Sequence, residues 1–381
     1  MTGDSAAQQI SLGRLLAIFF KIGSVGFGGG MAIISIMERE LVRERRLLPL
    51  DEFLHGVGFG QILGSFAVNT ALFVGYRLFG VVGGILSAAV FMLPSIVLVI
   101  VLSDLYFRFH AIPALQGAVA GLGPVVIALL VDAAWAIGER VLRSASTIIV
   151  AALSLAGGVL KLNTLLVLLS AVGMCFLLTR GESAPGQRAP GRSGPVLAIA
   201  PVLPALGTGS LLTTIGATFL KVGLVFFGGG FLLVPVLHHR LIADLHWLTA
   251  HEFVDGVAIS SLTPGPIAVL ATFAGYHMAG IAGALVATVA LMAPATALML
   301  VLSRQYARMR HDRWAQRFLC GLNPAVVGLV LSTAVLLGGG VLTSWQRWSF
   351  AAVSLLVLRK LKWPPVVLLA MSAAGGYFGL L

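Results

Sequence analysis

Apolar stretches long enough to cross a lipid bilayer follow one another along nearly the whole chain. A transmembrane helix needs about 17 to 25 mainly apolar residues. Of the 381 residues, 58% are hydrophobic and 10% are charged, which excludes an ordinary soluble domain. We therefore predict an all-α polytopic membrane protein, with spans near residues 11–37, 53–76, 80–103, 114–137, 146–160, 162–179, 211–237, 253–276, 281–303, 318–340, 347–358 and 364–381.

Charge and cysteine content narrow the function. The chain carries 25 Lys and Arg against 14 Asp and Glu, a net charge of +11. Arginines in cytoplasmic loops that set orientation explain most of this excess, and the remainder favours an anionic cargo. So little soluble surface argues against nucleic-acid binding.

Cys175 and Cys320 lie far apart in apolar segments, which indicates neither a disulfide nor a metal site. No removable signal peptide is expected at the start of the chain.

The string "FFKIGSVGFGGG" at residues 19–30 returns as "FLKVGLVFFGGG" at residues 219–230. The offset of 200 residues then continues without a gap, which indicates duplication and fusion. We predict a first transporter repeat over residues 1–180, a linker rich in Gly, Pro, Ser and Arg over 181–205, and a second repeat over 206–381. Duplicated spans are typical of secondary transporters, whose substrate binds where the repeats meet. A duplication that merely enlarges a scaffold is the alternative.

Each repeat places a lysine and three glycines inside its first span. Three glycines weaken a helix by about 1 kcal/mol each relative to alanine, so a broken or re-entrant helix is expected there. The N-terminus of the resumed helix would point free N–H groups at an anion. The lysine lies seven residues, about two turns, before the first glycine. Snorkelling of the lysine and tight helix packing are the alternatives. The predicted anion-binding residues are Lys21, Gly28, Gly29 and Gly30, and Lys221, Gly228, Gly229 and Gly230.

A second break is expected at Pro264-Gly265-Pro266, where the first repeat has Gly64-Ser65-Phe66. Hydroxyl and amide groups near both segments would add neutral donors to one cavity, although an interhelical hydrogen bond is the simpler role for any single side chain. The residues predicted to bind substrate here are Ser65, Asn69, Ser261, Thr263 and Gly265.

Together these motifs resemble the chromate ion transporter family in its long, two-domain form. The family pattern falls on "FxKxGxxxFGGG", on "EFxxGxxxxxxxPGPxxxxxxxxGY" and on a later "LPS", and it covers both halves. The matching positions include Lys21, Glu38, Glu52, Phe53, Asn69, Gly75, Tyr76 and Pro94 in the first half, and Lys221, Glu252, Phe253, Pro264, Gly265, Pro266, Gly275, Tyr276 and Pro294 in the second, besides the GGG triplets.

The resemblance implies export of chromate, with sulfate as the similar tetrahedral dianion, across the cytoplasmic (inner) membrane of a prokaryote. Without the resemblance, the residue pattern predicts only a transporter of anions. Two departures from the pattern bear on substrate choice: Gly64-Ser65-Phe66 replaces Pro-Gly-Pro in the first half, and "LHHR" at residues 237–240 replaces the "MERE" found at residues 37–40.

Three carboxylates are candidates for ion coupling: Glu38, Glu52 and Asp132. Asp132 lies inside a span and has Ser332 as its counterpart, but pairing with an arginine or a position near the membrane interface would explain it equally well. Glu52 lacks the preceding Thr that makes Glu252, three residues after Thr249, a helix-capping residue. Histidines near residue 240 lack the spacing of metal ligands, and no nucleotide-binding loop is present.

We therefore expect a transporter, not an enzyme, that works by alternating access on an ion gradient or membrane potential, without a cofactor. Its partners would be the oxyanion and the lipid bilayer. A passive anion channel, or a transporter of sulfate or another oxyanion, is the alternative. Oligomeric state, the number of crossings, and parallel or inverted arrangement of the repeats stay open.

Overall fold

A computed structural model describes residues 10–27, 30–109, 112–178, 210–225, 232–304 and 313–380, and this part of the chain forms helices and no strand. The predicted linker at 181–205 lies outside the described residues, as do Gly28, Gly29 and Gly228 to Gly230. The prediction of an all-α fold is confirmed.

The first half contains α1 (Leu12–Val25), α2 (Gly30–Met37), the π-helix η1 (Glu38–Glu44), α3 (Leu50–Ile62), α4 (Phe66–Phe109), α5 (Pro113–Val141), α6 (Ala145–Val159) and α7 (Thr164–Leu178). The second half repeats this order with α8 (Leu211–Val225), α9 (Leu233–His238), the π-helix η3 (His239–Asp244), α10 (Ala250–Leu262), the short 3-10 helix η4 (Ile267–Val269), α11 (Leu270–Arg304), α13 (Arg313–Val341), α14 (Trp345–Leu356), η5 (Val357–Leu361) and α15 (Pro365–Tyr377).

The longest helix of each half is kinked at the same place. In α4 the helical geometry is lost at Phe79 and Gly80, and in α11 at Ala279 and Gly280. Gly80 and Gly280 adopt φ values of +65° and +58°, which glycine tolerates without strain. These kinks lie at the predicted boundaries between spans, near residues 76–80 and 276–281.

Each kink brings glycines on its two sides into close contact. A Cβ placed on Gly83 would collide with the carbonyl oxygen of Gly75, although the two residues are eight positions apart in α4. In a straight helix they would be separated by about 12 Å. Gly275 and Gly283 of α11 approach each other in the same way. Each long helix is therefore two segments packed side by side.

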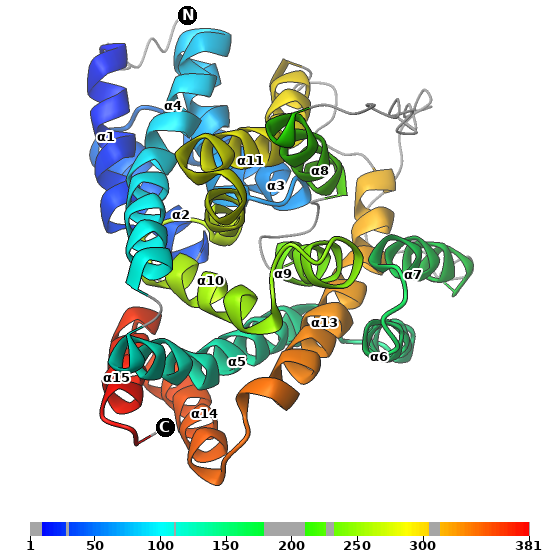
Figure 1. Ribbon diagram of the computed structural model, residues 1–381. Coiled ribbons are helices and arrows are strands. Elements are labelled where there is room, and N and C mark those ends of the chain that lie inside the picture. The colour runs from blue at the N-terminus through cyan, green and yellow to red at the C-terminus, as the bar shows by residue number, and fades with distance from the viewer. Residues whose placement is uncertain are drawn as a thin grey trace, which may run out of the picture.

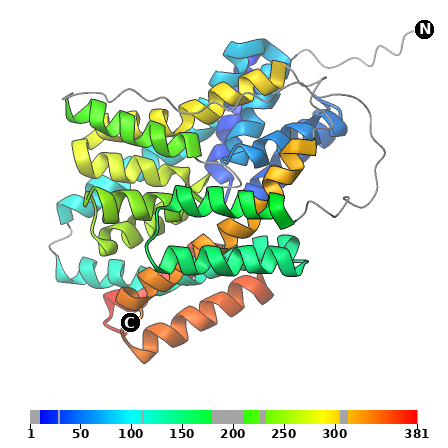
Figure 2. The ribbon, with the colours of Figure 1, turned by 90° about the vertical axis from the view of Figure 1, so that its right-hand side faces the viewer.

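The helices form two layers joined by α10 (Figures 1 and 2). One layer contains α1 packed on α4, α8 packed on α11, and the contact between α4 and α11. The other layer is built around α5 and α13, which also contact each other. Within it the halves exchange their last helices: α6 and α7 pack on α13, whereas α14 and α15 pack on α5. The halves are thus interlocked.

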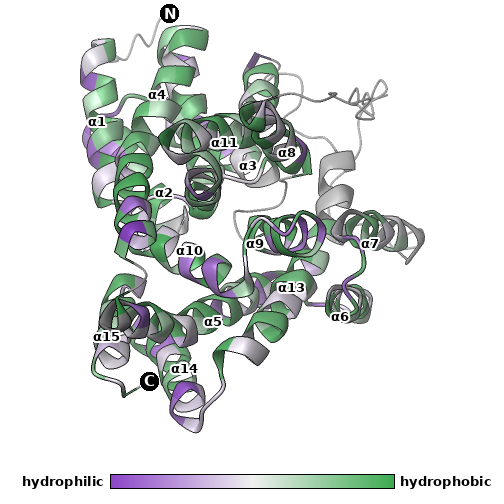
Figure 3. Ribbon diagram, in the orientation of Figure 1, coloured by the Kyte–Doolittle hydropathy of each residue, from purple (hydrophilic) through white to green (hydrophobic). Residues whose placement is uncertain are grey.

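Hydrophobic residues predominate along most of the helices (Figure 3). Large exposed hydrophobic residues include Val82, Leu166, Ile281 and Val289, a pattern suited to lipid contact. Four helical segments are long and apolar enough to cross a bilayer: Phe66–Phe109, Gln116–Val141, Ile267–Arg304 and Gly321–Val341. Shorter apolar helices, among them Ala145–Val159, Leu211–Val225 and Pro365–Tyr377, accompany them.

Candidate functional site

The helices α2 and α4 of the first half start close to each other in space. α1 ends at Val25, and α2 begins at Gly30, after the glycine-rich segment. A Cβ on Gly30 would collide with the ring of Phe66, the first residue of α4. The N-termini of α2 and α4 therefore lie side by side. Their free N–H groups and positive dipole ends favour an anion. Whether either segment is re-entrant stays a prediction.

Ser65 and Asn69 lie at this pair of N-termini. Ser65 immediately precedes α4, is 3% exposed, and its hydroxyl makes no hydrogen bond within the described part of the chain. The amide nitrogen of Asn69 donates to the carbonyl of Leu63, 3.2 Å away, at the end of α3. The second amide hydrogen of Asn69 is not used in that bond. Substrate binding by these two residues stays a prediction.

The Pro-Gly-Pro segment of the second half docks on the break of the first half. The backbone N–H of Gly265 donates to the carbonyl of Gly26, 2.9 Å away. The hydroxyl of Ser95, which follows Pro94 in α4, donates to the carbonyl of Pro264. Gly265 therefore contributes backbone contacts between the halves. Ser95 was not among the predicted residues, although it belongs to the "LPS" motif.

Two predicted hydroxyls are used locally. Ser261 donates to the carbonyl of Val257 at 2.8 Å, and Thr263 donates to that of Ser260 at 2.9 Å. A hydroxyl has one hydrogen, so neither group has a hydrogen left for an anion in this conformation. The neighbouring Ser260 is buried, and its hydroxyl has no hydrogen-bond partner among the described residues.

The two predicted lysines differ in their surroundings. The Lys21 ammonium donates to Glu40, 2.7 Å away, although its side chain is 61% exposed. Glu40 is buried and also accepts from Arg45 at 3.3 Å. The Lys21 hydrogen bond lowers the pKa of Glu40. In the second half the position equivalent to Glu40 is Arg240, so it offers no carboxylate to Lys221. Among the described residues, Lys221 forms no ion pair.

All three predicted coupling carboxylates lie within reach of arginines. Glu38 pairs with Arg43 at 2.8 Å, and Glu52 pairs with Arg77. Asp132 of α5 lies 3.6 Å from Arg359 of η5, the arginine pairing that the sequence left open as its alternative role. The predicted capping role of Glu252 is confirmed, because Thr249 and Glu252 form a reciprocal capping box at the start of α10.

A carboxylate and tyrosine cluster between the halves was not predicted. Asp255 of α10 accepts from the hydroxyl of Tyr106 in α4, 2.8 Å away. Asp104 of α4 accepts from the hydroxyl of Tyr276 in α11, 2.6 Å away. The sequence contained a signal for these residues. Asp255 is an acid within a predicted span, as Asp132 is. Tyr106 and Tyr276 each have a tyrosine counterpart at the offset of 200, which is Tyr306 for the first and Tyr76 for the second.

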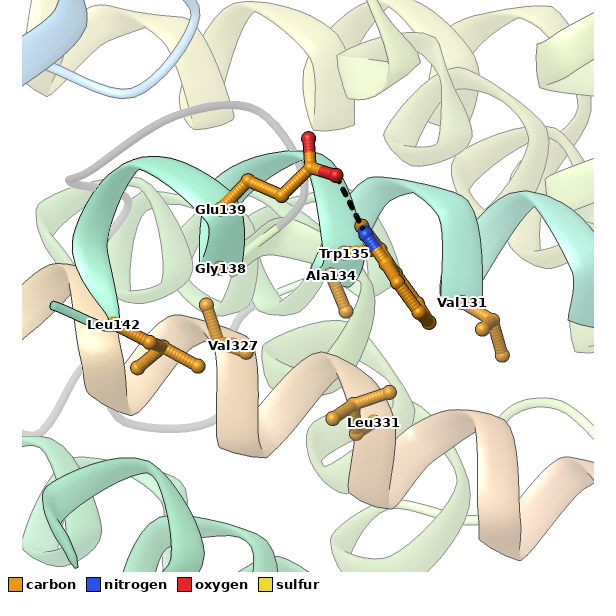
Figure 4. Close-up of a pocket in the computed structure, with 8 residues that line it drawn as sticks. All are labelled: Val131, Ala134, Trp135, Gly138, Glu139, Leu142, Val327 and Leu331. Carbon is orange, nitrogen blue, oxygen red and sulfur yellow. Dashed lines mark hydrogen bonds between the residues drawn. The ribbon is translucent and has the colours of Figure 1, made fainter. Parts of the chain in front are cut away.

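A cavity of about 390 Å³ between α5 and α13 does not suit an oxyanion (Figure 4). Its lining is apolar apart from Trp135 and Glu139, which hydrogen-bond to each other at 2.8 Å. The carboxylate of Glu139, which is paired with Arg359, has no hydrogen-bond donor to offer an anion. The lining residues are Val131, Ala134, Trp135, Gly138, Glu139, Leu142, Val327 and Leu331.

Comparisons with known proteins agree with the motifs. The family model for chromate transporters matches residues 13–176 and again residues 213–377. The chain is 30% identical to a chromate transport protein of Pseudomonas aeruginosa over 88% of this chain and 83% of that protein. It is 27% identical to a probable chromate transport protein of Synechococcus elongatus, covering 96% and 95% of the two chains, and 27% identical to a chromate transport protein of Cupriavidus metallidurans, covering 93% and 90%.

No solved structure matches the chain. The family match, by contrast, extends over most of both halves, and the helices above are those of a multi-pass protein of the prokaryotic cytoplasmic membrane. The chain therefore belongs to the chromate transporter family.

Proposed function

We propose that this protein carries chromate, or the chemically similar sulfate, across the cytoplasmic membrane. The names of its relatives support the substrate class. The observation that carries the proposal is the pair of adjacent N-termini at Gly30 and Phe66, beside the buried hydroxyl of Ser65, which has no hydrogen-bond partner in the described residues. A tetrahedral oxyanion accepts hydrogen bonds on all sides. Main-chain N–H groups at helix N-termini and a free hydroxyl are suitable donors.

In this proposal the substrate binds between the repeats of residues 1–180 and 206–381. Gly28, Gly29 and Gly30 provide main-chain donors in the first half, and Gly228, Gly229 and Gly230 do so in the second. Ser65 and Asn69 add side-chain donors. The bond from Gly265 to Gly26 keeps the segments of the two halves in contact.

The lysines raise the local concentration of the oxyanion in this proposal. Lys21 is paired with Glu40, which Arg45 also contacts, so we expect more of the effect from Lys221. An exposed lysine attracts a dianion over about the Debye length of 8 to 10 Å at physiological salt. Binding is therefore expected to weaken as ionic strength rises.

Transport is proposed to be export by alternating access, driven by an ion gradient or the membrane potential. Glu38, Glu52 and Asp132 stay predictions as coupling residues. A passive channel would give conductance without accumulation, and electrical recording on the reconstituted protein separates it from a carrier.

The test is uptake of labelled chromate and sulfate into inside-out vesicles that contain the wild-type protein, with and without a proton gradient and a membrane potential. We expect energised accumulation of chromate that excess sulfate inhibits. Vesicles without the protein are the control. If neither ion accumulates under any gradient, the proposed substrate class is wrong.

A further inference from the structure

Among the described residues, Asp255 is the buried carboxylate without a cation. It is 8% exposed, and its hydrogen bond comes from the hydroxyl of Tyr106. Glu40 is also buried, but Lys21 and Arg45 both donate to it. The other described carboxylates without an ion pair, Asp51 and Glu252, lie in the first turns of α3 and α10, where a helix N-terminus favours negative charge.

The helix does not compensate the charge of Asp255. α10 begins at Ala250, so Asp255 lies beyond the first turn, and the effect of the helix dipole declines within that turn. Glu252, one turn earlier on the same helix, adds charge of the same sign. An unpaired carboxylate in an apolar interior is expensive, and such groups usually become neutral by binding a proton.

The other charged and titratable groups on the helices around α10 do not supply a cation to Asp255. Asp104 of α4 is paired with Arg108 and accepts from Tyr276 of α11. Asp132 and Glu139 of α5 pair with Arg359. His238 of α9, whose ring centre lies 5.6 Å from that of Phe253, has no described bond to Asp255. The remaining groups on these elements, none with a described bond to Asp255, are Tyr76, Arg77, Arg140, His251, His277, Arg304 and Tyr377; the described side chains of α13 and η4 add no charged group.

We propose that Asp255 is a proton-binding site of the transport cycle, with Tyr106 of the other half as its hydrogen-bond partner. The inference rests on the proposed function, because a proton bound here matters only if the halves move during transport. Tyr106 can donate to the carboxylate, and after protonation it can donate to, or accept from, the neutral acid. Tyr106 can therefore bond to Asp255 in either protonation state while the interface is closed.

The position of Asp255 makes a change in charge relevant to movement. The donor Tyr106 belongs to the first half and the acceptor Asp255 to the second. In the other pair the donor, Tyr276, belongs to the second half and the acceptor, Asp104, to the first. Phe107 stacks on Phe273 and Tyr276, with ring centres 5.4 Å and 6.2 Å apart. Loss of the proton would place an uncompensated charge in this interface of α4, α10 and α11 and would favour its opening to water.

The carboxylate of this site is not duplicated. The residues equivalent to Asp255 and Asp104 at the offset of 200 are His55 and Arg304, which are basic side chains. The two halves therefore have different roles, with one such site for each chain.

The first test measures labelled chromate transport by the full-length protein in liposomes. Asp255→Asn should abolish accumulation driven by a pH gradient but keep exchange of chromate for chromate at equal pH. Asp255→Glu should restore accumulation, and Tyr106→Phe should shift its pH profile. Asp51→Asn, which removes an exposed carboxylate without an ion pair, is the matched control and should behave as wild type. Accumulation by Asp255→Asn with an unchanged pH profile would overturn the proposal.

The second test needs no substrate. Infrared difference spectra of the purified protein at stepped pH should show a protonated carboxyl band that is lost in Asp255→Asn and kept in Asp51→Asn. If this band is present while wild-type protein transports neither chromate nor sulfate, the proton site stands and the proposed function fails. If wild-type protein transports chromate but Asp255→Asn retains the whole titration, the proton site is wrong.

Discussion

The backbone N–H of Gly265 donates to the carbonyl of Gly26, 2.9 Å away across the contact between the two halves. This bond joins the Pro-Gly-Pro segment before α11 to the glycine-rich segment after α1. Gly265 has a φ of +110°, and a Cβ at this position would collide with the hydroxyl of Ser95. The contact therefore requires glycine for both backbone and space.

Gly265→Ala should lower stability by about 1–3 kcal/mol, because it combines backbone strain with overpacking. Thermal unfolding of the purified protein measures this. Gly339→Ala in α13 is the matched control, since a Cβ there meets nothing within 4 Å and alanine favours helix. Equal melting temperatures for the two variants would show that the contact around Gly265 adapts.

Lys221→Gln should reduce the rate of chromate transport more than Lys21→Gln, because Glu40 already neutralises Lys21. The difference should shrink at high salt, which screens exposed charges. Initial rates in vesicles at two ionic strengths test this, with protein levels in the membrane measured alongside. Lys161→Gln, a change in the turn between α6 and α7, is the control. Equal losses for the two motif lysines would contradict the proposed asymmetry.

The ion pair of Glu40 should make stability depend on acid pH. Because the Lys21 hydrogen bond holds the pKa of Glu40 below its unfolded value, the pair stabilises the protein above that value. This stability is lost as the pH falls through the lowered pKa. Lys21→Gln should raise the pKa of Glu40, so the acid loss begins at a higher pH.

The effect of Lys21→Gln near neutral pH should be modest, about 1 kcal/mol, because the lysine is exposed and Arg45 still donates to Glu40. Melting temperatures of wild type and variant across the acid range measure both effects. The same acid profile for the two proteins would show that Lys21 does not influence Glu40.

Gly283→Ala should destabilise the kinked α11 by about 1–3 kcal/mol or more, because its Cβ would meet the backbone of Gly275. Thermal unfolding again measures the change, and Gly173→Ala in α7, where a Cβ meets nothing within 4 Å, is the control. A change no larger than that of the control would mean that the two segments of α11 separate at low cost.

Several features followed from the sequence because they depend on neighbouring residues. The length of the apolar stretches predicted helices, and the constant offset predicted two equivalent halves. Gly80 and Gly280 lie at predicted boundaries because the left-handed backbone at a kink is a local property of glycine. The capping role of Glu252 depends only on its spacing from Thr249.

Part of the candidate site was also predictable. In the structure Gly30 begins α2, and Ser65 and Asn69 lie at the start of α4, while their predicted role in substrate binding stays a prediction. Their mutual position was not predictable, since it depends on how α2 packs against α4. The bonds of the Ser261 and Thr263 hydroxyls to carbonyls of their own helix were not predicted, because the sequence offered an interhelical hydrogen bond as the alternative to substrate binding.

The sequence by itself determined a duplicated, helical membrane protein. Only the tertiary structure decided which charges are paired: Lys21 meets Glu40 because α2 returns along α1, and Asp255 meets Tyr106, 149 positions away, because α10 packs between the layers. Apolar helices present similar surfaces to many partners, so hydropathy does not select among them. Close glycine contacts and a few buried polar pairs make that selection.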